Sequence, residues 1–165
     1  MGDQSPLSCG ICSVHRDSEQ LKALEIWRSE RWLLRHHPLP APLSGWCLLD
    51  SRRHLGGPAD FWPEEAREWG LIVQRASQLV KQVSGCDRVY VIAFGEGARH
   101  LHLHLIPRFG SDPLTQAWCV ADLYREVERG QRPGADPDLF RSWMTRAREV
   151  ADALMAGTPN SVERL

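Results

Sequence analysis

Three histidines stand at alternate positions in the run GEGARHLHLHLIPRF, residues 95–109. His100, His102 and His104 are separated by single leucines, so on a β-strand the imidazoles share one face and the leucines share the other. Near neutral pH an imidazole can act as a nucleophile, carry a proton or bind a metal ion. The alternative interpretation is a solvated strand face that is rich in histidine by chance.

A single metal ion held by all three histidines does not suit a regular strand. Positions 100 and 104 lie about 13 Å apart along a strand, whereas ligand nitrogens around one zinc ion lie within about 4 Å of one another. Neighbouring histidines at i and i+2 can still converge on one ion. We therefore expect the three imidazoles to have different roles.

A second reactive group is the Cys9–Cys12 pair in CGIC. Its spacing is that of two thiolates on one tetrahedral zinc ion, brought together by a tight turn. A redox pair has the same spacing but is expected at a helix N-terminus in a βαβ unit, and the sequence shows no such unit. Five cysteines, an odd number, favour thiols or metal ligands over a disulfide framework. Cys47, Cys86 and Cys119 have no partner at metal spacing and are interpreted as ordinary residues.

The elements that must position these groups form an α+β pattern. Two short β-prone runs around the polar RSER, residues 28–31, predict a hairpin, and residues 45–51 predict another strand. Apolar residues at spacings of three and four predict a long helix from Pro63 to Gly85. Two strands, RVYVIAF and RHLHLHLIPR, follow it and should pair antiparallel across a glycine turn, and two helices fill the last third. The predicted sheet is mostly antiparallel, with the long helix after its third strand and helices at the C-terminus.

Composition narrows the possible functions. A chain of 165 residues suits a single domain, 1–165. With 20 basic and 21 acidic side chains, the net charge of −1 gives no reason to expect nucleic acid as a partner. No run approaches the roughly 20 apolar residues of a membrane span, and the N-terminus does not resemble a secretion signal. We therefore expect a cytoplasmic protein.

The run His100-Leu-His-Leu-His-Leu-Ile, followed by Pro107 and Arg108, resembles the motif of the histidine triad (HIT) superfamily. The resemblance covers about residues 7–110, because SGWCLLDSRRH and ADFWPEEA are also similar to that family, and leaves residues 111–165 as a helical C-terminal extension. It implies a HIT-like fold, a homodimer and a nucleotide hydrolase that acts at an α-phosphate of a dinucleoside polyphosphate or nucleoside phosphoramidate. A nucleotidyl transferase and a non-catalytic nucleotide-binding module are the alternatives.

The resemblance also implies roles for individual residues. His102 corresponds to the family nucleophile, which forms a covalent nucleotidyl intermediate, and His104 corresponds to the histidine that contacts a phosphate oxygen. Some branches, including galactose-1-phosphate uridylyltransferases and a set of bacterial proteins, bind zinc with four residues that correspond here to Cys9, Cys12, His54 and His100. Four protein ligands would make the zinc structural. At the position of His54, three other histidines remain alternatives: His15, His36 and His37.

The turn before the triad departs from the family pattern. FGEGARH replaces a Gly-Gln-Ser-like turn whose amide and hydroxyl groups bind the α-phosphate. Gly95 and Gly97 can still offer backbone N–H groups to a phosphate, and Arg99 can offer a charge-assisted contact, although alternation turns it away from the face of His100. This departure is the best support for a non-catalytic module. Four tryptophans are candidates for base stacking or for the core: Trp27, Trp32, Trp46 and Trp62.

Overall fold

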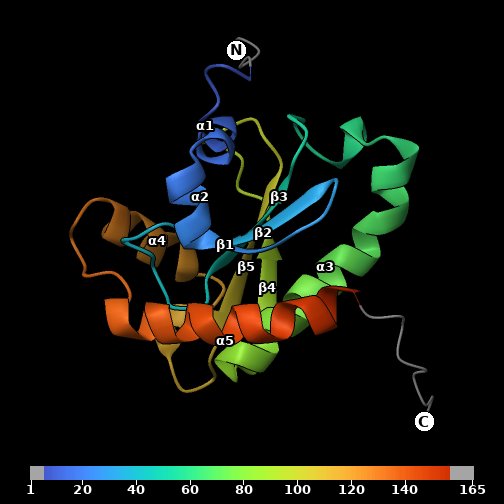
Figure 1. The fold of residues 1–165 in the computed structure, drawn as a ribbon. Helices are drawn as coiled ribbons and strands as arrows, with labels where there is room; N and C mark the ends of the chain where they lie inside the picture. Colours follow the sequence, from blue (N-terminus) through green and yellow to red (C-terminus); the bar gives the residue numbers. More distant parts are fainter. Residues whose placement is uncertain (1–5, 157–165) are drawn as a thin grey trace.

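A five-stranded antiparallel sheet in the order β1-β2-β3-β5-β4 forms the centre of the molecule (Figure 1). The computed structural model describes residues 6–156. The strands are β1 (Glu25–Arg28), β2 (Trp32–His36), β3 (Cys47–Ser51), β4 (Arg88–Ile92) and β5 (His102–Arg108). This sheet confirms the predicted α+β class, the N-terminal hairpin and the antiparallel pairing of the last two strands.

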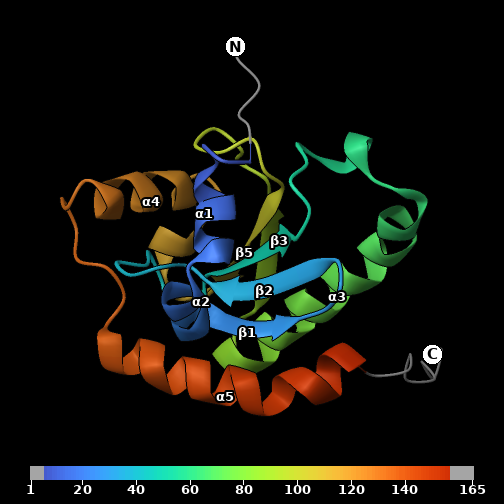
Figure 2. The ribbon, with the colours of Figure 1, turned by 45° about the horizontal axis from the view of Figure 1, so that its top comes forward.

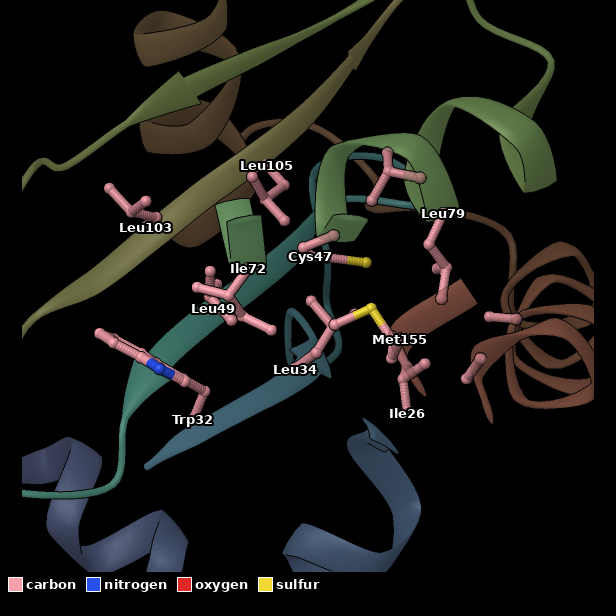
Figure 3. Close-up of a cluster of buried hydrophobic side chains, with 14 of the residues drawn as sticks. Ile26, Trp32, Leu34, Cys47, Leu49, Ile72, Leu79, Leu103, Leu105 and Met155 are labelled. Carbon is pink, nitrogen blue, oxygen red and sulfur yellow. The ribbon is translucent and has the colours of Figure 1, made fainter. Parts of the chain in front are cut away.

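Two long helices cover one face of the sheet. Helix α3 (Pro63–Ser84) begins with proline in its first turn and ends at Gly85, whose left-handed conformation (φ +65°) suits glycine. Helix α5 (Pro137–Ala156) packs beside it. Between these helices and the sheet lies the main core, where Leu103 and Leu105 point toward Leu49 (Figure 3). The leucines of the triad run are therefore core residues, as predicted.

Shorter helices lie toward the opposite face (Figure 2). These are α1 (Gly10–Arg16) and α4 (Val120–Glu128), while α2 (Ser18–Leu24) leads from α1 into β1. Two 3-10 turns complete the described chain, η1 (Pro58–Asp60) and η2 (Pro113–Thr115). Among the described residues, no helix is long and apolar enough to span a membrane.

The N-terminal segment differs from its prediction. A tight turn was expected at the cysteine pair, but Cys9 is the residue before α1 and Cys12 lies within that helix. The cysteine pair thus does lie at a helix N-terminus, the setting that a redox pair prefers. The βαβ unit that accompanies redox pairs is not formed, because α1 and α2 precede β1 and no described strand comes before them.

Shortening a core side chain should destabilise the fold. Leu105 is completely buried between β5 and the helices, so Leu105→Ala leaves a cavity and should lower the free energy of unfolding by about 2–5 kcal/mol. Leu139→Ala, at a side chain that is 63% exposed, is the control and should change it by less than about 0.5 kcal/mol. Urea unfolding of both variants measures the difference, and equal effects would contradict this core assignment.

Acid should destabilise the protein through buried histidines. His36 donates from Nδ1 to the carbonyl of His37 and accepts at Nε2 from the amide of Gly45, both at 2.8 Å, so its neutral form is the one that fits. Burial lowers the pKa of His36 to about 4. Between about pH 6.5 and 4 the unfolded chain then binds a proton that the folded chain does not, so stability falls as the pH falls.

We expect His36 alone to account for a loss of about 2 kcal/mol at about pH 5. Urea unfolding at neutral pH and at this pH should show a smaller loss in His36→Gln than in the wild type. His37 and His104, whose pKa values burial also lowers, keep the remaining loss in the variant. An equal loss in both proteins would contradict the assignment to His36.

Candidate functional site

The register of β3 and β5 sets the residues on the open face of the sheet. Asp50 pairs with His102 and Leu48 pairs with His104, so these side chains share the face opposite the main core. His100 lies before β5 begins and is therefore outside this row. The structure thus separates His100 from His102 and His104, which share one face of β5.

A cavity of about 690 Å³ opens over this face. Its floor includes Leu48, His102 and His104, and its walls come from α1, the loop at 37–42, the loop at 94–98 and α4. A space of this volume suits a nucleotide-sized ligand. Helix α4 belongs to the C-terminal extension, whose role could not be predicted from the sequence.

His102 is half-buried in the cavity, with one ring nitrogen engaged. Its Nδ1–H donates to the backbone carbonyl of His100 at 2.6 Å. Because a neutral imidazole has one N–H, this bond leaves the lone pair on Nε2. The arrangement supplies the fixed tautomer that nucleophilic attack requires.

His104 is held in the opposite tautomer. Trp46 donates from Nε1 to the Nδ1 atom of His104 at 2.9 Å, so the proton of the neutral ring is on Nε2. The pKa of His104 is lowered to about 3, mainly by burial and next by the charge of His102. His104 is therefore neutral near pH 7, and its Nε2–H remains as the donor of a residue that lines the cavity.

The turn before β5 contributes its glycines to the cavity. Gly95 and Gly97 both line it, and Gly95 has the positive φ of +68° that favours glycine. Arg99 is exposed and does not belong to the lining. Gly95 and Gly97 therefore border the cavity and Arg99 does not, and the phosphate contacts expected of these residues stay predictions.

The four predicted metal ligands lie together beside the cavity. One potential ligand atom from each of Cys9, Cys12, His54 and His100 lies within 4.8 Å of the other three. The Sγ atom of Cys12 is 3.4 Å from Nδ1 of both histidines, and that of Cys9 is 3.7 Å from Nδ1 of His100. Such separations match neighbouring ligands on one tetrahedral zinc ion.

The donor chemistry of this cluster also fits a metal. His100 donates from Nε2 to the carbonyl of Ser51 at 2.6 Å, which leaves its Nδ1 lone pair facing the sulfurs. Burial, together with the hydrogen bond to Cys9 and the charge there, raises the pKa of the Cys12 thiol to about 11. A cation is what would hold such a thiol as the thiolate that metals bind.

The alternative ligands to His54 are occupied elsewhere. His15 bonds through Nε2 to Asp50 at 2.9 Å, while His36 and His37 bond to neighbouring backbone groups. Of the five histidines that were not assigned as nucleophile or phosphate contact, His54 and His100 are thus the two that face the cysteines.

The aromatic residues that line the cavity are not the predicted ones. Trp27 and Trp32 belong to the main core, and Trp62 packs against the guanidinium of Arg53. Instead, Phe94 and Tyr124 line the cavity, and both rings contact His104. Sequence reasoning missed them because Tyr124 lies in a helix without a recognised motif and Phe94 lies at the end of a predicted strand.

Several solved protein structures are similar to this chain in fold. No protein-family model and no curated protein matches the sequence. Among solved structures, a zinc-bound histidine triad family protein from Mycobacterium smegmatis is 19% identical, with a TM-score of 0.65 over 92% of this chain and 99% of that chain. A hypothetical histidine triad nucleotide-binding protein from Sulfolobus tokodaii is 16% identical, with a TM-score of 0.64 over 93% and 98% of the two chains.

A third structure, a Hit-like protein involved in cell-cycle regulation from Bartonella henselae, is 13% identical, with a TM-score of 0.65 over 90% of this chain and 98% of that chain. The shared architecture extends beyond the 7–110 segment that carries the sequence resemblance. At these identities the comparison concerns architecture alone, and it agrees with the motif: this chain has the fold of the histidine triad proteins.

Proposed function

We propose that this protein hydrolyses nucleotide derivatives at the α-phosphate, through a nucleotide bound covalently to His102. The observation that carries the proposal is the state of His102, whose Nδ1–H is held by the carbonyl of His100 while Nε2 keeps its lone pair at the floor of a nucleotide-sized cavity. The solved structures with this fold include a protein described as nucleotide-binding, which supports a nucleotide as the ligand.

The reaction has two balanced steps. In the first, Nε2 of His102 attacks the α-phosphorus, the N–P bond forms, and the bond from phosphorus to the leaving group breaks with its electron pair. A phosphoramidate releases an amine and a dinucleoside polyphosphate releases a nucleotide, each of which takes up a proton. In the second step water attacks phosphorus and loses a proton to solvent, the N–P bond breaks with its electron pair returning to Nε2, and the nucleoside monophosphate leaves. His104 donates from Nε2 to a non-bridging oxygen as charge develops there.

We also propose that Cys9, Cys12, His54 and His100 bind a structural zinc ion. Four protein ligands close a tetrahedral shell, so the ion would neutralise the two thiolates and connect α1 to the start of β5. The side chain of His100 serves the ion, and its carbonyl holds the nucleophile. The zinc-bound structure with the same fold supports this proposal.

The zinc proposal predicts a stoichiometric metal. The purified protein should contain about one zinc ion per chain by elemental analysis, and Cys12→Ser or His54→Ala should lose nearly all of it. A strong chelator should lower the thermal midpoint of the wild type, since metal binding contributes to folding. Cys119→Ser, outside the cluster, is the matched control and should keep its zinc. Retention of zinc by both ligand variants would contradict the assignment.

The covalent step predicts an adduct on one residue. Brief mixing with adenosine 5′-phosphoramidate should add one adenylyl group to the intact mass of the wild type, and His102→Ala should show neither adduct nor release of AMP. His104→Ala should still form the adduct but about 10²–10³-fold more slowly, as on loss of one transition-state donor.

Other outcomes separate the alternatives. An adduct that persists until an alcohol or phosphate acceptor is added would favour the nucleotidyl transferase, because both functions share the first step. Binding of AMP without any adduct across phosphoramidates and dinucleoside polyphosphates would favour the non-catalytic module and contradict the hydrolase.

A further inference from the structure

A buried arginine lines the same cavity as the histidines. Arg35, on β2, is only 1% exposed, and it lines the cavity with His37, His102 and His104. A guanidinium remains charged even when it is buried, and its planar fork of N–H donors matches the oxygens of a phosphate. Arg35 lies outside the histidine triad motif and takes no part in the reaction proposed above.

Asp50 holds one edge of this guanidinium. Nε of Arg35 lies 2.6 Å from Oδ2 of Asp50, and Nη2 lies 3.4 Å from Oδ1. Asp50 is completely buried and also accepts a hydrogen bond from His15. These two bonds use Nε and Nη2, and Arg35 lines the cavity, so Nη1 is the guanidinium nitrogen that remains for a ligand there. The arginine is thus fixed on one edge and available on the other.

The sheet register places this charge next to the histidines. Asp50, which binds the guanidinium of Arg35, is opposite His102 in the β3–β5 pairing. Leu48 is opposite Arg35 on β2 and opposite His104 on β5. Burial is the main cause of the low pKa values of His37 and His104, and the charge of Arg35 lowers both further. The guanidinium therefore lies within electrostatic reach of the imidazoles in the cavity.

The other arginine of the cavity lining is less suited to hold a phosphate. Arg125, on α4, is ion-paired with Asp122 on the exposed surface of the same helix. Exposed cations bind anions weakly because solvent screens them, whereas a desolvated cation with a fixed orientation binds them more strongly. Arg35 is therefore the better-placed cation among the described residues of the lining.

We propose that Arg35 binds the phosphoryl group that His102 attacks, and that it supplies the grip for which the family uses the glutamine and serine of the turn. Its free edge donates hydrogen bonds to a non-bridging oxygen, and these bonds strengthen as negative charge develops on that oxygen. Arg35 forms no covalent bond in either step of the reaction. The proposal rests on the proposed function, because it needs a phosphate at His102.

The test removes the charge without leaving its partner unpaired. Arg35→Gln alone would leave Asp50 buried and uncompensated, so the main variant is Arg35→Gln with Asp50→Asn, which removes both charges. Arg35→Lys is the second variant, because it keeps the charge and loses the planar fork. Arg28→Gln, on the neighbouring strand β1 and paired with Glu25 at the surface, is the matched control. Circular dichroism and urea unfolding establish that each variant is folded.

Binding is measured by calorimetry with AMP and with adenosine, which differ only in the phosphate. The double variant should lose at least tenfold in affinity for AMP and little for adenosine, while Arg35→Lys should fall between it and the wild type. Turnover of adenosine 5′-phosphoramidate and of a dinucleoside polyphosphate should fall by a similar factor, about 10²-fold, because both present the same α-phosphate. Arg28→Gln should match the wild type in every assay.

Three results would overturn the role of Arg35. The first is unchanged AMP affinity and turnover in the folded double variant. The second is an equal loss of affinity for adenosine and AMP, which would place the arginine at the nucleoside. The third is a loss confined to the dinucleoside polyphosphate, which would place it at the leaving group. Failure of the proposed function looks different, because the wild type itself would then form no adduct with any of these compounds.

Discussion

His100 connects three parts of the molecule through three different atoms. Its Nδ1 faces the cysteines at the start of α1, its Nε2–H donates to the carbonyl of Ser51 at the end of β3, and its own carbonyl accepts the Nδ1–H of His102. Movement of this residue would therefore disturb the cysteine cluster, the start of β5 and the tautomer of the proposed nucleophile together. Through this coupling, the proposed structural zinc ion would influence chemistry at the proposed nucleophile, His102, without touching the substrate.

The pairing of β3 with β5 extends that constraint to the whole sheet. Side chains alternate between faces, so the register that sends Leu103 and Leu105 into the main core sends His102 and His104 into the cavity. A slip of one residue would exchange the two sets and expose the leucines. Helices α3 and α5, which cover the core face, therefore help to position the cavity face without touching it (Figures 1 and 3).

Local patterns in the sequence predicted much of this arrangement, and long-range contacts explain the rest. The period of two in the triad run predicted the two faces of β5, and Pro63 and Gly85 predicted the bounds of α3 within a residue. The helix at the cysteine pair was missed because it is only seven residues long, too short for a helical period to stand out in the sequence. Arg35 and Tyr124 were missed because their positions in the cavity depend on partners far along the chain, and no spacing rule connects β2 or α4 with the triad.

The charges of the cavity explain why imidazoles alone would be a poor phosphate site. Burial lowers the pKa values of His37 and His104 to about 4 and about 3, so both rings are neutral near pH 7 and offer dipoles instead of charges. Neutrality suits a hydrogen-bond donor, but it does not balance the negative charge of a phosphoryl group. A guanidinium keeps its charge under the same burial, and Asp50 fixes its orientation. In the proposed site, the guanidinium of Arg35 thus carries the positive charge that the neutral rings of His37 and His104 lack.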